Sequence, residues 1–254
     1  QKRDTHYRSP ELEMISDKNN FIFVQYAAGS GGKAISCCLQ TANKVGSWWD
    51  EVPPIDSLVS LHTNDCYHAR TEPQPPYRFD WLSTTHGVTR GDNLSLDEVK
   101  LLLTQDESAK RILQDGKKIS LIWTKKHLPD WFDDHLIQII VDPRSLSWFT
   151  RRRKQLFYVE SDAGVIETRY DSRYHTRPDR HDRRVSSLPI DELVLKQIQE
   201  ETIMPNPSAY QIQLSWLLDQ QWSQVFDVLE NAINDTIDRA WCEQYLIAWH
   251  KKVF

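Results

Sequence analysis

The sequence lacks the features that mark fibrous, low-complexity or membrane-spanning chains. Only 8 of its 254 residues are Gly and 12 are Pro, which excludes a collagen-like or low-complexity protein. It also lacks any apolar run near the ~18–20 residues that a transmembrane helix needs. Aromatic residues make up 11% of the chain, including 10 Trp, and charged residues make up 26%. That composition favours a folded domain over a disordered chain, so we expect a globular protein without membrane partners.

Cysteine is scarce as well. The chain has four, and two of them, Cys37 and Cys38, are adjacent and so rarely bridge each other. This usage is typical of a reducing compartment, which predicts a cytoplasmic location. The Cys and His residues do not have the spacing of metal ligands, so the sequence predicts no metal site.

An excess of positive charge is also missing. There are 31 Lys and Arg against 36 Asp and Glu, a net charge of −5, which argues against a nucleic-acid partner. The charge is uneven, because residues 144–187 hold eleven basic and six acidic residues, or +5, and leave −10 for the remainder. A local arginine cluster in an acidic chain favours a defined anion site, and a solvated, salt-bridged loop is the alternative.

The pattern along the chain predicts one α/β domain. Residues 1–19 are polar and are expected to be a mobile lead-in. Residues 20–254 are expected to form a single domain whose portion 188–254 is helical. In that portion Trp216, Trp222, Trp241 and Trp249 recur at helical spacing and are expected in the core.

Short apolar runs predict the strands, and amphipathic runs between them predict the helices. Strands alternating with helices predict a mainly parallel sheet with helices on both faces, whose ligand lies at the carboxyl ends of the strands. The predicted strands are 21–26, 57–62, 119–123 and 135–141, and predicted helices start at Lys33, Ser95 and Ser145.

A Gly-rich loop joins the first predicted strand to the first predicted helix. Its sequence, Tyr26-Ala27-Ala28-Gly29-Ser30-Gly31-Gly32-Lys33-Ala34, suits backbone N–H groups that converge on a phosphate at a helix N-terminus. The nucleotide-binding loop G-x-x-x-x-G-K-[ST] is matched at Gly32-Lys33, but Ala27 replaces its first Gly and Ala34 its magnesium-binding hydroxyl. The alternative is a Gly-rich turn that only packs helix against strand.

Two further runs follow predicted strands and raise a resemblance. Lys125-Lys126-His127-Leu128-Pro129 follows strand 119–123, and Asp142-Pro143-Arg144-Ser145-Leu146-Ser147-Trp148-Phe149 follows strand 135–141. This order resembles the sulfotransferases that use 3′-phosphoadenosine-5′-phosphosulfate (PAPS), whose cytosolic branch has K-T-H-L-P and R-[DN]-P after corresponding strands. The first run matches K-T-H-L-P at four of five positions, and the Gly loop keeps Ser30-Gly31 of the family's P-K-S-G-T-T. The resemblance covers roughly residues 20–150.

The resemblance implies a P-loop-like α/β sulfotransferase fold and a metal-independent reaction. A sulfuryl group would pass from PAPS to a hydroxyl or amine of a small molecule, leaving 3′,5′-ADP. His127 would be the general base, and Lys125 and Lys33 would stabilise charge on the bridging oxygen. The donor-binding residues implied are Gly29, Ser30, Gly31, Gly32, Lys33, Ala34, Arg144, Ser147 and Arg152.

Two positions depart from the family pattern. Gly29 stands where the family has a loop lysine, and Val141 stands where it has the arginine that grips the 3′-phosphate. Lys33 would therefore replace the lysine, and Arg144 or one of residues 151–153 would replace the arginine.

The acceptor is specified less closely than the donor. His62, His86 and Trp81 are the candidate acceptor contacts, and the acidic, aromatic remainder of the chain suits a small neutral or cationic molecule. Two alternatives stay open: a P-loop kinase that uses ATP and magnesium, against which Ala34 argues, and a catalytically degenerate binding protein of the same fold. The sequence does not specify the oligomeric state.

Overall fold

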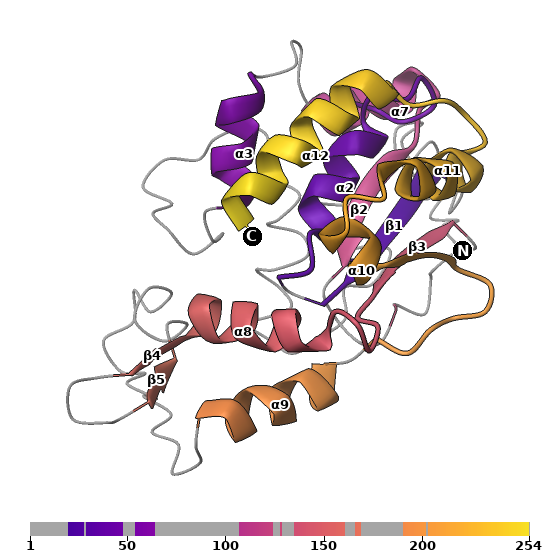
Figure 1. The fold of residues 1–254 in the computed structure, drawn as a ribbon. Coiled ribbons are helices and arrows are strands. Elements are labelled where there is room, and N and C mark those ends of the chain that lie inside the picture. The colour runs from indigo at the N-terminus through magenta and orange to yellow at the C-terminus, as the bar shows by residue number, and fades with distance from the viewer. Residues whose placement is uncertain are drawn as a thin grey trace, which may run out of the picture.

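A four-stranded parallel sheet forms the centre of the computed structural model (Figure 1). Its strands are β1 (Phe21–Tyr26), β2 (Ile119–Trp123), β3 (Leu136–Ile140) and β6 (Tyr210–Gln213). The strand order is β2-β1-β3-β6, and every pairing in the sheet is parallel. The structure describes residues 20–27, 29–47, 54–63, 107–123, 128, 135–160, 166–168, 190–201 and 203–253.

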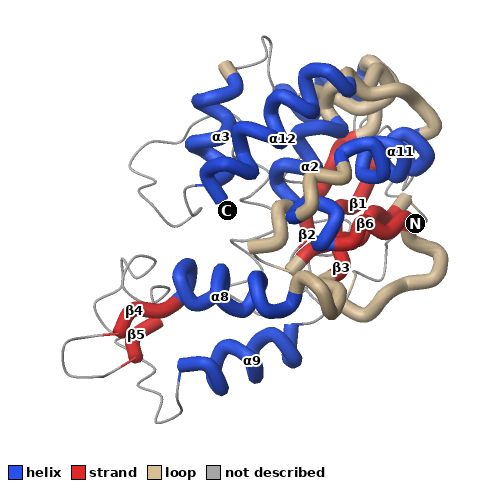
Figure 2. The backbone as a smooth tube through the Cα atoms, in the orientation of Figure 1, coloured by secondary structure: helices blue, strands red, loops and turns tan. Residues whose placement is uncertain are grey.

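The described helices surround this sheet, and a small antiparallel hairpin lies apart from it (Figure 2). The helices are α2 (Gly32–Leu39), α3 (Ile55–Thr63), α7 (Glu107–Gln114), α8 (Leu146–Phe157), α9 (Ile190–Glu201), α10 (Leu214–Leu218), α11 (Trp222–Ile233) and α12 (Arg239–Val253). The hairpin pairs β4 (Tyr158–Glu160) with β5 (Ile166–Thr168). No helix in these described ranges is long and apolar enough to cross a bilayer.

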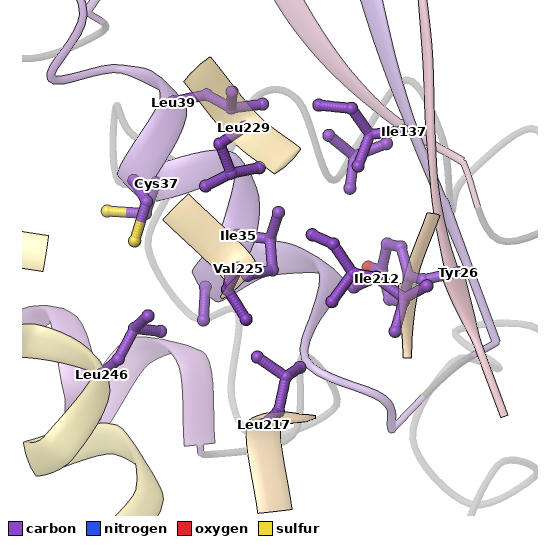
Figure 3. Packing of buried hydrophobic residues seen from close by; sticks show 14 of the residues in the cluster. Tyr26, Ile35, Cys37, Leu39, Ile137, Ile212, Leu217, Val225, Leu229 and Leu246 are labelled. Atoms are coloured by element: carbon purple, nitrogen blue, oxygen red, sulfur yellow. The ribbon is translucent and has the colours of Figure 1, made fainter. Parts of the chain in front are cut away.

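Alternate residues of the central strand β1 enter two separate hydrophobic clusters. Phe21 and Phe23 pack with the buried face of α7, whereas Ile22 and Val24 belong to a larger cluster with α2, α11 and α12. Successive side chains of a strand point to opposite faces, so helices cover both faces of the sheet. Figure 3 shows side chains of α2, α11 and the sheet meeting in the larger cluster. The predicted parallel α/β architecture is confirmed.

A buried amide pair connects the strands to the segment before β6. Gln138 Nε2 donates to Gln25 Oε1 at 2.7 Å, and Gln138 Oε1 accepts from the backbone N–H of Asn206 at 2.8 Å. Both glutamine side chains are almost completely buried, so these bonds satisfy polar groups that would otherwise be costly to bury. They also fix the chain that leads into β6 against β3.

Most of the predicted elements are confirmed, with two corrections. The strands predicted at 21–26 and 119–123 have those bounds, strand 135–141 is β3, and the helices after Lys33 and Ser145 are α2 and α8. The strand predicted at 57–62 is wrong, because this segment is helix α3: Ile55, Leu58 and Val59 share one face of the helix. The C-terminal portion also contains a strand, β6, that was not predicted.

The four C-terminal tryptophans lie in or against the hydrophobic core, as predicted. Trp222 and Trp249 are buried, and Trp216 and Trp241 pack against the same cluster. The predicted lead-in at 1–19 and the predicted helix start at Ser95 lie outside the described residues.

Candidate functional site

The Gly loop is a tight turn between the last residue of β1 and the first residue of α2. Gly29 and Gly31 have φ angles of 97° and 90°, in the left-handed region that favours glycine. Ser30 is fully buried, and both its N–H and its hydroxyl donate to the carbonyl oxygen of Ala27, at 3.0 and 2.7 Å. The buried Ser30 therefore stabilises the turn by two hydrogen bonds to the residue that begins it.

Neighbouring rings leave no room for side chains where α2 begins. A Cβ at Gly32 would lie 2.0 Å from the ring of Tyr26, and a Cβ at Gly31 would lie 2.9 Å from the indole of Trp249. Trp249 belongs to the C-terminal helix α12, so residues more than 200 positions apart meet at this loop. Two of the loop glycines are thus required by packing.

The start of α2 has the composition of an anion site. Gly31 is the N-cap, and the first turn, Gly32-Lys33-Ala34, carries no acidic residue. The N–H groups of a helix's first turn have no acceptor within the helix and sit at the positive end of its dipole. Lys33 adds a partly buried positive charge, and buried Ala34 has no hydroxyl to offer a metal ion.

A second structured turn lies at the same edge of the sheet, between β3 and α8. One carboxylate oxygen of Asp142 accepts from the backbone N–H of Arg144 at 3.0 Å, and the other accepts from that of Ser215 at 2.9 Å. Burial alone would raise the pKa of Asp142, but the hydrogen bonds from Ser215, Ser145 and Arg144 outweigh it and lower the pKa below its ordinary value. This carboxylate fastens the end of β3 to the start of α10.

Helix α8 brings a buried arginine to this edge. Ser145 just before the helix, and Phe149 and Arg153 within it, are all nearly fully buried, which is the i, i+4 spacing of one helix face. The Arg153 guanidinium lies over the Phe149 ring, 5.7 Å from its centroid. Arg153 also lines a small pocket, partly open to solvent and with about 10 Å³ of space for a water-sized molecule, together with Ala27, Ile139, Val141, Phe149, Ile198 and Ile203. Because Ala27 begins the Gly loop, Arg153 lies beside that loop.

The predicted donor residues fall in different environments. The loop residues from Gly29 to Ala34 lie together at the carboxyl end of β1. Arg144 is exposed, where its Nη2 pairs with Asp219 Oδ2 at 2.6 Å. Ser147 is exposed and Arg152 is partly buried on α8.

The other predicted residues are less defined. His62 lies in helix α3, whereas the sequence predicted it at the end of a strand. Lys125, His127, His86 and Trp81 lie outside the described residues. The sequence left Arg144 and residues 151–153 open as the replacement arginine and selected Arg152. Of residues 151–153, the buried one is Arg153, four positions after Phe149 and eight after Ser145.

Neither a cluster of metal ligands among the described residues nor a known relative indicates which reaction the site performs. Within the part of the chain that the structure describes, no three His, Cys, Asp or Glu side chains gather to hold a metal ion. Comparison with protein-family models, curated proteins and solved structures finds no match for this chain. Its function must be argued from the residues of the site.

Crowding at the Gly loop can be separated from backbone strain by two alanine variants. Gly31 and Gly116 both have positive φ, 90° and 69°, so an alanine costs about 1–2 kcal/mol at either position. A Cβ at Gly116 meets nothing within 4 Å, whereas one at Gly31 meets Trp249. We expect Gly31→Ala to be more destabilising than Gly116→Ala by about 1–3 kcal/mol in urea unfolding. Equal losses would contradict the packing of Trp249 on the loop.

The role of Asp142 can be tested by pH. Its folded-state pKa is lowered, so its contribution is full above the unfolded value of about 3.9 and is lost as pH falls through the folded pKa. Asn at this position does not titrate and offers one acceptor oxygen for two backbone donors. Asp142→Asn should therefore be less stable than the wild type at pH 7, with the gap closing below about pH 4. A gap that is unchanged at pH 3 in denaturant unfolding would show that the carboxylate charge is irrelevant.

Proposed function

We propose that this protein is a sulfotransferase that moves a sulfuryl group from PAPS to a hydroxyl or amine of a small molecule without a metal ion. The observation that carries the proposal is the Gly loop, which ends a central parallel strand and opens a helix whose first turn is Gly-Lys-Ala. A phosphate fits this position because backbone N–H groups and the helix dipole both favour an anion there. The missing hydroxyl at Ala34 matters less to a reaction that needs no magnesium.

Topology supports the proposed position of the second motif. In the sheet β2 lies beside β1, and Trp123 at the end of β2 is in register with Gln25. The chain therefore leaves β2 at the edge of the sheet where the Gly loop begins. The residues that follow include Lys125 and His127, so the proposed base and the proposed phosphate site start from adjacent strand ends.

Each residue has a defined task in the proposed reaction. PAPS, when bound, would supply the sulfuryl group, and its bridging oxygen would leave as part of 3′,5′-ADP, in line with the acceptor oxygen or nitrogen that forms the new bond to sulfur. Lys33 and Lys125 stabilise the negative charge that develops on the bridging oxygen. His127 removes the proton from the acceptor, a task suited to an imidazole that titrates near neutral pH. The proposed contacts for the 3′-phosphate of PAPS are Arg144, Ser147 and Arg152.

Nucleotide binding distinguishes this proposal from its alternatives. We expect 3′,5′-ADP to raise the melting temperature without magnesium, since a ligand at about 100 times its Kd adds about 2.7 kcal/mol to stability. Lys33→Met should reduce this shift, whereas Lys251→Met, an exposed lysine on α12, should preserve it.

Two other outcomes of that assay would contradict the proposal. Stabilisation by ATP with magnesium, and not by 3′,5′-ADP, would identify a P-loop kinase. Failure of every adenine nucleotide to bind at millimolar concentration would identify a binding protein of the same fold, consistent with Gly29 and Val141 at positions where the resembled family has charged residues.

The proposed base is tested by replacing His127. His127→Ala should lower turnover by about 10²- to 10⁴-fold and leave 3′,5′-ADP binding unchanged, because the histidine acts on the acceptor. Turnover is measured as release of 3′,5′-ADP from PAPS with a panel of small phenols, alcohols and amines. His135→Ala is the matched control, since His135 precedes β3 at the opposite edge of the sheet. Full activity of His127→Ala would remove this residue from the mechanism.

A further inference from the structure

Three buried thiols that the proposed reaction does not use lie where α12 packs on α2. Cys37 and Cys38 belong to α2 and Cys242 to α12, and each has 1% or less of its surface exposed. The Sγ of Cys242 lies 3.8 Å from the carbonyl oxygen of Cys38, and the two thiols are hydrogen-bonded to each other. Cys37 is hydrogen-bonded to the hydroxyl of Tyr245. Of the two adjacent cysteines, Cys38 is therefore the one in contact with Cys242.

Thr41 joins the two helix ends at which Cys38 and Cys242 meet. Its hydroxyl donates to the carbonyl oxygen of Cys38 at 2.8 Å and accepts from the backbone N–H of Asp238 at 3.0 Å. The same oxygen lies 3.6 Å from Cys242 Sγ. Asp238 caps α12, since its carboxylate accepts from the backbone N–H of Trp241 at 3.0 Å. Hydrogen bonds from both helix ends thus hold the two thiols close together.

The packing of α12 on α2 connects the thiol pair to the Gly loop. Trp249, seven residues after Cys242, packs on Gly31, which is seven residues before Cys38. Seven residues of helix span about 10.5 Å, so the equal spacings show that α12 runs antiparallel to α2 here (Figure 1). A covalent bond at the start of α12 would therefore fasten the helix whose last turns cover the loop.

The two thiols differ in acidity. The hydrogen bonds from Cys38 and Thr41 lower the pKa of Cys242 below its ordinary value, although burial opposes them. Burial raises the pKa of the Cys38 thiol well above its ordinary value. Since the thiolate is the reactive form, Cys242 is the thiol that reacts first. It lies in the first turn of α12 after exposed residues 238–240, and local opening of a helix end admits a small oxidant.

We propose that Cys38 and Cys242 are a redox pair that hydrogen peroxide converts to a reversible disulfide between α2 and α12. The Cys242 thiolate attacks one peroxide oxygen, the O–O bond breaks, and a sulfenic acid and hydroxide form; the hydroxide takes up the proton that Cys242 lost. The Cys38 sulfur then attacks the Cys242 sulfur, and its proton leaves with the sulfenic hydroxyl as water. Peroxide gains the two electrons that the thiols lose, and dithiothreitol returns them. This pair is independent of the proposed sulfuryl transfer.

Peptide mapping of the folded wild type tests the pair without any variant. After treatment with hydrogen peroxide and blocking of the remaining thiols with iodoacetamide, trypsin releases residues 34–44, with Cys37 and Cys38, and residues 240–251, with Cys242. We expect these two peptides to be joined, with the bond placed at Cys38 by fragmentation between residues 37 and 38, and to separate in dithiothreitol. A bond at Cys37 or Cys66, or no bond between the two peptides, would overturn the proposal.

Alanine variants of the two adjacent cysteines provide the matched control. The disulfide would close a long loop of the unfolded chain, so oxidation of the wild type should raise the urea midpoint by about 1 M. Cys37→Ala should keep this shift and Cys38→Ala should abolish it, although each removes a buried thiol of α2. If Cys38→Ala does not fold, Cys242→Ala replaces it. A wild-type midpoint that oxidation leaves unchanged, or an equal rise in the variant that lacks one member of the pair, would contradict the assignment.

Discussion

The absence of space for a side chain at the start of α2 is the constraint on which the rest of this structure depends. The rings of Tyr26 and Trp249 occupy the positions that a Cβ at Gly32 and Gly31 would need. Tyr26 ends the central strand and Trp249 lies near the end of the last helix, so a single contact region joins β1, α2 and α12. The same loop places the N-terminus of α2, the positive end of its dipole, at the carboxyl end of β1.

The side chain of Asp142 links the C-terminal part of the chain, at Ser215, to this edge of the sheet. Its two oxygens accept from the backbone N–H groups of Arg144 and Ser215, which are 71 positions apart in the sequence. This connection fixes the turn from which α8 departs. Since Ser145, Phe149 and Arg153 repeat every four residues, the direction set by the turn determines that Arg153 is directed inward.

Strands β1, β2 and β3 could be predicted from the sequence because each is an apolar run with a single polar residue, as expected for strands buried on both faces. Strand β6 was not predicted because only Ile212 of its four residues is fully buried, so its sequence contains no apolar run. Helix α3 was mistaken for a strand because Leu58 and Val59 are adjacent, and their shared helical face with Ile55 becomes evident only in the structure. The contact between Gly31 and Trp249 has no local signal at all, since it joins opposite ends of the chain.

The charge of the ligand illustrates a further limit of reasoning from composition. The acidic, aromatic remainder of the chain outside residues 144–187 favoured a neutral or cationic small molecule, but a sum of charges does not distinguish exposed groups from buried ones. Charges on the surface are screened over about 8 Å at physiological ionic strength, whereas a buried charge is screened much less. Arg153 is almost fully buried, and its field acts on whatever enters the adjoining pocket. A positively charged side chain is therefore buried in the wall of this pocket, on the inner face of α8, although the protein as a whole is acidic.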